Sequence, residues 1–278
     1  MITKLLWGLA PTVVPFVVLG ALELKFPGER LKTARGWVFN LKLALLYQTV
    51  PVLLGALMAA LILLIRGHNG GGLIDLSFDA SGIGMTLTAC LIFMLIFDFF
   101  YYWWHRAQHE FDGLWAIHKL HHMDESLGVS TQMRVHWLEE IGRIPFIFIP
   151  MALIFDLPIH SGLVAIVITV WTCFIHANLR LGLGPLGVII AGPQVHRIHH
   201  SRLPQHHNRN YAALFPIYDV IFRTYYHPAH DEYPPTGVEG EPEISRVTAA
   251  FMLPFLHWRD WFRARQTAAM PRLDTLGD

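Results

Sequence analysis

The sequence predicts an all-α integral membrane protein with three full transmembrane helices, a shorter helical hairpin and a cytoplasmic helical cap that carries clustered histidines. Three observations predict this fold class. Of the 278 residues, 53% are hydrophobic and only 15% are charged, which is too apolar for a disordered chain. Several apolar segments reach the length of about 20 residues that a spanning helix needs. Eight of the 17 histidines form tight groups outside these segments.

The three predicted spans are residues 5–24, 43–65 and 83–104. The first contains only Glu23 as a charge, the second contains none and the third contains only Asp98. The first segment could be a signal peptide, but it lacks a clean small-residue cleavage site, so we expect it to be retained.

Two shorter apolar segments, residues 144–155 and 159–175, are separated by a turn-like Asp-Leu-Pro break at residues 156–158. They predict a tight helical hairpin that is tilted or crosses the bilayer only partly. A buried core helix is the alternative for any one apolar segment, but five of them in a chain of this length favour a membrane.

Basic residues predict the orientation, because loops rich in Lys and Arg stay in the cytoplasm. Between the second and third spans there is only one, Arg66. We therefore expect the first loop and every histidine group on the cytoplasmic side, in a multi-pass protein. The first loop carries five basic residues: Lys25, Arg30, Lys32, Arg35 and Lys42.

The histidine groups predict a metal site. Residues three and four apart share a helix face, so the members of each group point the same way. Imidazole ligates Fe, Zn, Cu or Ni, and eight imidazoles exceed what one ion can hold, so two metal ions are expected. One group could be a polar helix face, but three favour metal. The groups are His105 and His109; His118, His121 and His122; and His196, His199 and His200.

Charge and cysteine content exclude other classes. The 21 Lys and Arg residues balance the 21 Asp and Glu residues, which removes the electrostatic case for a nucleic-acid binder. Only Cys90 and Cys173 are present, each in an apolar run, so neither a disulfide framework nor a CxxC metal site is possible. Electrons for any redox chemistry must therefore come from an external donor.

The HxxxH, HxxHH and HxxHH motifs resemble those of the fatty acid hydroxylase and sterol desaturase superfamily of membrane oxygenases. Residues 98–110, 174–176 and 183–186 add to the likeness, as does the Asn-x-Asn-aromatic element at residues 208–211. The resemblance covers roughly residues 23–226. Within the superfamily, the motifs are most like those of alkylglycerol monooxygenases and their bacterial relatives.

The chain departs from the family pattern at three places. Arg223 replaces the glycine of a Trp-Asp-x-x-Phe-Gly-Thr element, Ala212 stands where many members have glycine, and Arg180 stands where some have a further histidine. No histidine of the three groups is missing. These changes therefore bear on the substrate and the partner rather than on the metal centre.

The resemblance implies a non-haem di-iron monooxygenase, a hydroxylase that uses O2 to hydroxylate, or desaturate, a C–H bond of a lipid or sterol-like substrate drawn from the bilayer. It implies two iron ions, although zinc would satisfy the same imidazoles in a purified sample. The external electron donor would be a redox protein or a reduced pterin.

Four further residues are candidates for the site. His176 matches a family ligand, and His136 lies in an Arg-x-His-x-x-Glu element that only some members share, so it is as well explained by a structural role. Asp98, costly inside a span, and Glu110 could accept N–H bonds from ligating imidazoles. An interface residue and a solvated charge are the respective alternatives.

The domain prediction is one fatty acid hydroxylase-like membrane domain over residues 1–278, with its core at 23–226. Residues 228–278 are expected to form a C-terminal loop and an amphipathic helix, with aromatic residues at helical spacing and arginines nearby. Such a helix could lie at a headgroup surface or pack on the catalytic domain. Pro254 should kink or restart it.

Two rival functions stay open. A membrane acyl-lipid desaturase has similar histidine groups, and only product analysis separates it, because hydroxylation retains oxygen. A non-enzymatic haem- or metal-binding membrane protein is the second rival. A haem carrier would place its histidines on facing spans within the bilayer, whereas these lie beyond the span ends.

Overall fold

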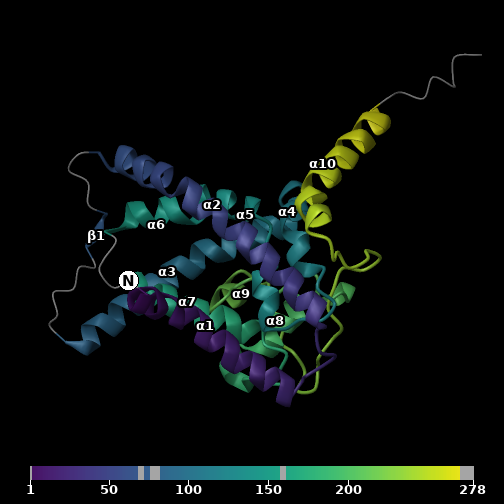
Figure 1. Cartoon of the computed structure of the whole chain (residues 1–278), viewed down its shortest axis with the longest axis horizontal. Helices are drawn as coiled ribbons and strands as arrows, with labels where there is room; N and C mark the ends of the chain where they lie inside the picture. The colour runs from purple at the N-terminus through teal and green to yellow at the C-terminus, as the bar shows by residue number, and fades with distance from the viewer. Residues whose placement is uncertain (1, 68–71, 76–81, 157–160, 270–278) are drawn as a thin grey trace, which may run out of the picture.

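The computed structural model describes residues 2–67, 72–75, 82–156 and 161–269, which are mostly helical, with long irregular segments between the helices (Figure 1). Two long helices form the body of the molecule, α2 (Ala34–Arg66) and α3 (Ile83–Glu110). The other elements are α1 (Ile2–Lys25), β1 (Ile74–Asp75), α4 (Asp112–His122), η1 (Val129–Met133), α5 (Leu138–Arg143), η2 (Ile144–Phe148), α6 (Ile149–Ile154), β2 (Phe155–Asp156), α7 (Ser161–His176), η3 (Gly184–Val188), α8 (Pro193–His199), η4 (Pro204–His206), α9 (Ile217–Ile221) and α10 (Val247–Ala269).

Helices α2 and α3 are long and apolar enough to cross a membrane. Their most apolar windows have mean hydropathies of 2.3 and 2.2, yet only 6% and 17% of those windows are buried. A core helix of a water-soluble protein would bury its apolar side chains, so the exposed apolar surface of these two helices fits a lipid environment. The protein is therefore helical and membrane-like, as the sequence predicted.

The first predicted span, residues 5–24, lies within α1, but the side chains of residues 2–12 are outside the described ones. Beyond them, Val13, Val14, Val17 and Val18 are exposed. That residues 5–24 form a further full span, and the orientation of the chain, stay predictions.

Both long helices extend past the predicted spans into the cap. Helix α2 starts at Ala34, where the Thr33 hydroxyl accepts a hydrogen bond from the Gly36 amide at 3.2 Å and caps the helix. Helix α3 continues to Glu110 and carries the first histidine group on its last turns. The first histidine group thus stands on the extension of α3 beyond the predicted span.

The predicted hairpin is helical, but its two arms pack on different helices. Residues 144–154 form a π-helical turn followed by α6, because the prolines at 145 and 150 cannot donate the usual hydrogen bonds. Segment α6 packs on α2 and α3, whereas α7 packs chiefly on α1, η1 and α8. Strand β2 pairs in parallel with β1. The predicted turn at residues 156–158 falls mostly outside the described residues.

The C-terminal helix α10 packs by its first half on α4 and α2 and then projects from the body (Figure 1). Ala250 is fully buried, and the Trp258 indole donates to the Gly113 carbonyl at 2.8 Å, whereas Phe262 is exposed. The helix is continuous through Pro254. The start of the helix therefore packs on the domain, as one sequence alternative predicted, and the headgroup-surface alternative for its end stays a prediction.

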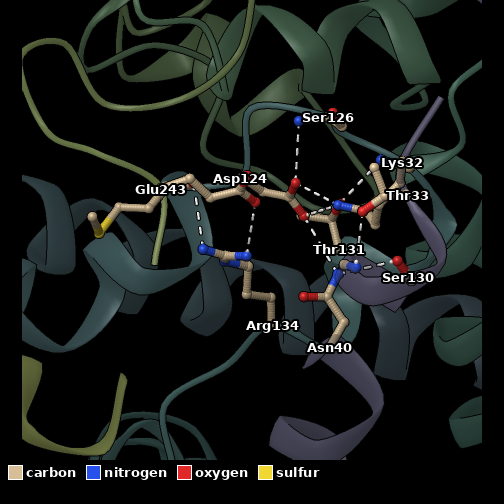
Figure 2. Close-up of polar contacts among 12 residues, drawn as sticks. Lys32, Thr33, Asn40, Asp124, Ser126, Ser130, Thr131, Arg134 and Glu243 are labelled. Carbon is tan, nitrogen blue, oxygen red and sulfur yellow. Dashed lines mark hydrogen bonds and ion pairs between the residues drawn. The ribbon is translucent and has the colours of Figure 1, made fainter. Parts of the chain in front are cut away.

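A buried polar network ties the α1–α2 loop to the cap (Figure 2). Lys32 forms an ion pair with Asp124, which also accepts hydrogen bonds from Thr131 at 2.8 Å and Asn40 at 3.4 Å. Ser130 accepts a further hydrogen bond from the Asn40 amide. Every charge of this pair is answered inside the protein, which fixes the segment that follows the second histidine group.

Arg134 completes the network from the other side (Figure 2). Its guanidinium donates to the carbonyls of Leu120 and Ile244, both at 2.9 Å, and pairs with Glu243 at 3.2 Å. The Arg134 side chain is fully buried. It therefore links helix α4, which carries the second histidine group, to the chain that leads into α10.

Candidate metal centre

The histidines of the three sequence groups, with His176, converge into two clusters in the cap. One ring nitrogen from each residue can be chosen so that all nitrogens of a cluster lie within 4.8 Å of one another. The rings come from α3, α4, α7 and the end of α8. The five-histidine cluster contains His105, His109, His118, His122 and His199, and the four-histidine cluster contains His121, His176, His196 and His200.

The two later sequence groups are divided between the clusters. His118 and His122 join one cluster and His121 the other; likewise His199 is separated from His196 and His200. Successive helical residues are rotated by about 100°, so an HxxHH motif offers ligands to both sides of one helix face. The sequence predicted one shared helix face for each group. In the structure, the face of each HxxHH group is divided between the two clusters.

In the five-histidine cluster, Nε2 of His118 lies 3.0 Å from Nε2 of His105 and 3.1 Å from Nε2 of His122. The outer nitrogens meet hydrogen-bond acceptors. Nδ1 of His105 lies 2.7 Å from the carbonyl oxygen of Tyr211, and Nδ1 of His118 lies 3.0 Å from a carboxylate oxygen of Glu139. Nδ1 of His199 lies 2.8 Å from the Arg209 carbonyl.

In the four-histidine cluster the inner nitrogens also face one another. Nε2 of His176 lies 3.1 Å from Nε2 of His121 and 3.0 Å from Nε2 of His196, whose Nε2 is 3.2 Å from that of His200. Nδ1 of His176 donates to the Thr172 carbonyl at 2.7 Å.

The donor set fits metal ions. A neutral imidazole carries one N–H, and the outer acceptors place it on Nδ1 of His105, His118 and His176, which leaves a bare lone pair on each Nε2. Bare lone pairs about 3 Å apart repel unless a cation lies between them. Two ligands bound at about 2.0–2.1 Å and at right angles stand about 3.0 Å apart.

Two buried nitrogens support the same conclusion. Nε2 of His109 and Nε2 of His199 have no hydrogen-bond partner, although both atoms are buried. Buried polar atoms are normally hydrogen-bonded, so partnerless nitrogens within a cluster of facing imidazoles fit a site for an ion.

Burial keeps these rings neutral, which is the form that binds metal. Desolvation, followed by the neighbouring imidazoles, lowers the pKa of His118, His122 and His200 well below 6.5. Burial also lowers the pKa of His199 to about 4. The rings are therefore ready to ligate at neutral pH.

His136 lies outside both clusters. Its side chain is buried, but Nε2 donates to the Phe251 carbonyl at 3.1 Å and Nδ1 accepts from the Leu138 amide at 3.2 Å. Both ring nitrogens are thus used by backbone groups. The structure gives His136 the structural role that the sequence left open, where it joins α10 to the start of α5.

The two predicted acids do not contact the histidine rings. Asp98 is fully buried and accepts hydrogen bonds from the backbone amides of Ala213, Leu214 and Phe215, at 2.7–3.2 Å. It acts at one remove, since it holds the segment next to the Tyr211 carbonyl to which His105 donates. Glu110 pairs with Arg106 at 2.7 Å, one turn earlier on α3.

Glu139 is the acid that does contact a cluster ring, and the sequence reasoning did not select it. Only 3% of Glu139 is exposed, and burial raises the pKa of its carboxyl to about 7. The signal in the sequence is the Arg-x-His-x-x-Glu element, in which Glu139 is the final residue. Only the histidine of that element was a candidate from the sequence. A carboxylate that accepts a ligand's outer N–H fixes the ring orientation and raises its basicity.

His206 also supports the site from the loop after the last group. It is fully buried, with Nδ1 2.9 Å from the Ser201 hydroxyl and Nε2 3.0 Å from Glu232. This contact ties the loop at residues 229–237 to the segment that follows His200. His207 is exposed and lines a polar cavity together with His109, His122 and His199.

Two cavities flank the centre. The polar one has a volume of about 460 Å³ and borders the five-histidine cluster. The apolar one, of about 390 Å³, lies between α2, α3, α6 and α7, with Met58, Phe97 and Ile168 in its lining. Glu140, beside Glu139 in the chain, also lines it. An apolar space between membrane helices thus adjoins the segment that supports the first cluster.

Glycines 182, 184 and 187 have the spacing of a dinucleotide-binding fingerprint. That motif requires a preceding strand and a following helix within a βαβ unit. Here the residues lie in and before η3, a short 3-10 helix, and the only strands in the described ranges are β1 and β2. The spacing therefore does not indicate a nucleotide site.

The family comparison agrees with these motifs. Residues 90–224 match the family model described as fatty acid hydroxylase. This range contains all nine clustered histidines and Glu139. The resemblance stated from the sequence is confirmed.

Named relatives are lipid-modifying enzymes. An alkylglycerol monooxygenase from Caenorhabditis elegans is 30% identical over 203 residues, which are 71% of this chain and 38% of the relative. Ornithine lipid hydroxylase OlsE from Rhizobium tropici is 31% identical, over 53% of this chain and 45% of the relative. A Delta(7)-sterol 5(6)-desaturase from Gibberella zeae is 27% identical, over 64% and 48%.

The matched parts cover less than half of each of these relatives. No solved structure matches the chain.

Proposed function

Residues 90–224 belong to the fatty acid hydroxylase family, and we propose that the protein is a membrane-bound di-iron monooxygenase that uses O2 to hydroxylate a C–H bond of a lipid. The observation that carries this proposal is the convergence of five and four histidines into two clusters whose ring nitrogens face one another at 3.0–3.2 Å. Two neighbouring clusters suit a pair of ions. Iron, when bound there, would supply O2 activation and the oxidising power for the C–H bond.

The side chains of this protein would hold and orient the reaction partners. The clustered imidazoles would ligate the ions, and Glu139 would keep the His118 ring in its ligating orientation. The Tyr211 carbonyl would do the same for His105, with Asp98 anchoring the neighbouring backbone. These contacts use the outer ring nitrogens and leave the inner ones for an ion, so the site would be preorganised.

The apolar cavity between the membrane helices would receive the hydrocarbon chain of the substrate. Its lining is almost wholly aliphatic and aromatic, and its residues come from the two most lipid-exposed helices as well as from α6 and α7. A chain entering from the bilayer would exclude water from this side of the site. The relatives' names, which mention alkylglycerol, ornithine lipid and a sterol, support a lipid substrate.

The proposal also includes the source of the electrons and the orientation of the protein in the membrane. An external donor, either a redox protein or a reduced pterin, would reach the cap through its aqueous face. We place that face in the cytoplasm, with α1, α2 and α3 as full spans, because the basic residues of the α1–α2 loop favour this orientation. Reporter fusions to the α1–α2 loop and to the C-terminus, both expected inside, would test it.

The test is lipid analysis of cells with and without the protein, using a uniformly labelled lipid pool and 18O2. Hydroxylation predicts a product heavier by one 18O atom, whereas a mass loss of two hydrogens with no 18O would identify a desaturase. Purified protein should contain about two iron or zinc ions per chain. No change in any lipid, or a sample with a haem band and no bound non-haem metal, would overturn the proposal.

A further inference from the structure

A further cavity, of distinct chemistry, lies between the start of α2 and the start of α10. Its volume is about 620 Å³. Three cations line it, Arg35 and Lys42 from α2 and Arg246 from the segment before α10, with the hydroxyls of Ser245 and Thr248 beside them. No acidic residue is part of the lining. Residues some 200 positions apart thus gather one sign of charge around one space.

These three cations differ from the basic residues nearby. Lys32, Lys119 and Arg134 each pair with a carboxylate, from Asp124, Glu241 and Glu243 respectively. Across the described ranges, the side chains of the cavity's three cations form no ion pair or hydrogen bond, and all three are exposed. The nearby acids Asp124, Glu241 and Glu243 already form ion pairs with other basic residues. The positive charge of the cavity is therefore not neutralised by them.

The cavity also offers backbone donors. Val247 and Thr248 stand at the first turn of α10, a helix of 23 residues, where amide N–H groups lack intrahelical partners. Such amides, together with Arg and Lys side chains, favour a phosphate group. The helix start adds to the binding set that the three cations already form.

The depth of the cavity selects the source of the phosphate. Lys42 directly precedes the uncharged run at residues 43–65, so it lies where a membrane helix leaves the hydrocarbon region. Val38 lines the same cavity and is 51% exposed, as is the neighbouring Leu41. Cations beside exposed apolar side chains match a lipid, whose headgroup and chains are adjacent, better than they match a free ion.

We propose that this cavity binds the phosphate headgroup of an anionic glycerophospholipid from the bilayer and that the bound lipid joins α2 to α10. Arg35, Lys42 and Arg246 contact the phosphate, and Ser245 and Thr248 donate further hydrogen bonds. The site is independent of the histidine clusters, and its occupancy requires neither metal nor turnover.

The test is native mass spectrometry of the delipidated full-length protein, titrated with phosphatidylglycerol, phosphatidylcholine or inorganic phosphate. Saturable binding of phosphatidylglycerol is expected, with phosphatidylcholine weaker and inorganic phosphate unable to displace the lipid. Each cation removed should weaken binding about five-fold. The variant Arg35→Gln/Lys42→Gln/Arg246→Gln should therefore bind about 100-fold more weakly.

The charge-matched control is Lys25→Gln/Arg30→Gln/Arg202→Gln, which removes three exposed cations outside the cavity. It should bind phosphatidylglycerol as the unaltered protein does. Equal weakening in both triple variants, or no weakening in the first, overturns the site. Displacement by inorganic phosphate overturns the lipid as its ligand. The single variant Arg246→Gln, which should lose about five-fold, keeps the test valid if the triple variant fails to fold.

Discussion

Two buried polar regions of the cap lie next to each other in the chain and are built on opposite principles. In the network of Lys32, Asp124, Arg134 and Glu243, each charge meets an opposite charge (Figure 2). In the histidine clusters, like groups face like groups, with nitrogens 3.0–3.2 Å apart and no counterpart between them.

The pairing of buried polar groups distinguishes a structural network from a ligand site. Burial of polar groups is costly unless partners satisfy them. Every charge of the network is paired within the protein, so its role is to hold segments together. The histidine clusters place ring nitrogens against one another instead, which fits a site for an ion.

The largest expected effect is the loss of a cluster ring. His121→Ala and His199→Ala, one from each cluster, should each reduce bound metal, abolish turnover and leave the protein folded in the membrane. Metal analysis by mass spectrometry and product assays check this. His230→Ala, at a fully solvent-exposed ring, is the control and should change neither readout. Full metal content in both cluster variants would remove the distinction between the two regions.

Breaking the charged network should have the opposite signature. Asp124→Asn leaves the buried Lys32 ammonium without its partner, which should lower the free energy of unfolding by about 3–5 kcal/mol. Metal content per folded molecule should stay near that of the unaltered protein. Denaturant unfolding in detergent measures the first and metal analysis the second.

The double variant Lys32→Met/Asp124→Asn is the control for this prediction. With both charges removed, a large part of the lost stability should return. If the double variant is as unstable as Asp124→Asn, charge pairing does not explain the role of the network.

Glu139→Gln tests the contact between an acid and a cluster ring. The glutamine keeps the size of the side chain but weakens the acceptor of the His118 N–H, so metal affinity should fall about 10- to 100-fold. Competition with a chelator of known affinity measures it. Glu140→Gln, at the neighbouring carboxylate that faces the apolar cavity, should leave metal affinity within about two-fold. Equal losses would show that proximity alone matters.

In the metal-free protein, lowering the pH should destabilise the histidine clusters before it destabilises the charged network. Burial lowers the pKa of His118, His122 and His200 well below 6.5, so below that pH the unfolded chain binds more protons than the folded one. The free energy of unfolding should therefore fall as pH drops through about 6.5.

The charged network should respond only at lower pH. Although burial raises it, the Lys32 and Arg134 charges hold the pKa of Asp124 below 3.8, so its contribution is lost only at more acidic pH. Unfolding free energies of chelator-treated protein between pH 7.5 and 5 check both statements. A stability that is flat over this range would contradict the neutral state of the clusters.

The smallest expected effect lies outside both regions, at Arg223. Its φ of 62° is in the left-handed region, which explains why the family pattern has glycine there. Arg223→Gly should raise the free energy of unfolding by up to about 1 kcal/mol and leave metal content unchanged. Asn208→Gly, at a φ of 59°, is the control and should gain less, because asparagine tolerates this conformation.

The sequence by itself determined the class of the protein and most of its site. Apolar runs located helices α2 and α3, because lipid exposure requires length and hydrophobicity that are visible in the chain. Local spacing identified the histidine groups, since positions three and four apart share a face on any helix. Their expected convergence is what the structure describes.

The tertiary structure alone decided how the rings are divided and supported. The acceptor for His105 is a backbone carbonyl 106 residues away, and every residue has a carbonyl, so no residue type announces it. For the same reason Asp98, which binds backbone amides, and His136, which binds a backbone carbonyl, could not be assigned from their neighbours in sequence. Periodicity determines which face a side chain occupies, whereas long-range packing determines what that face meets.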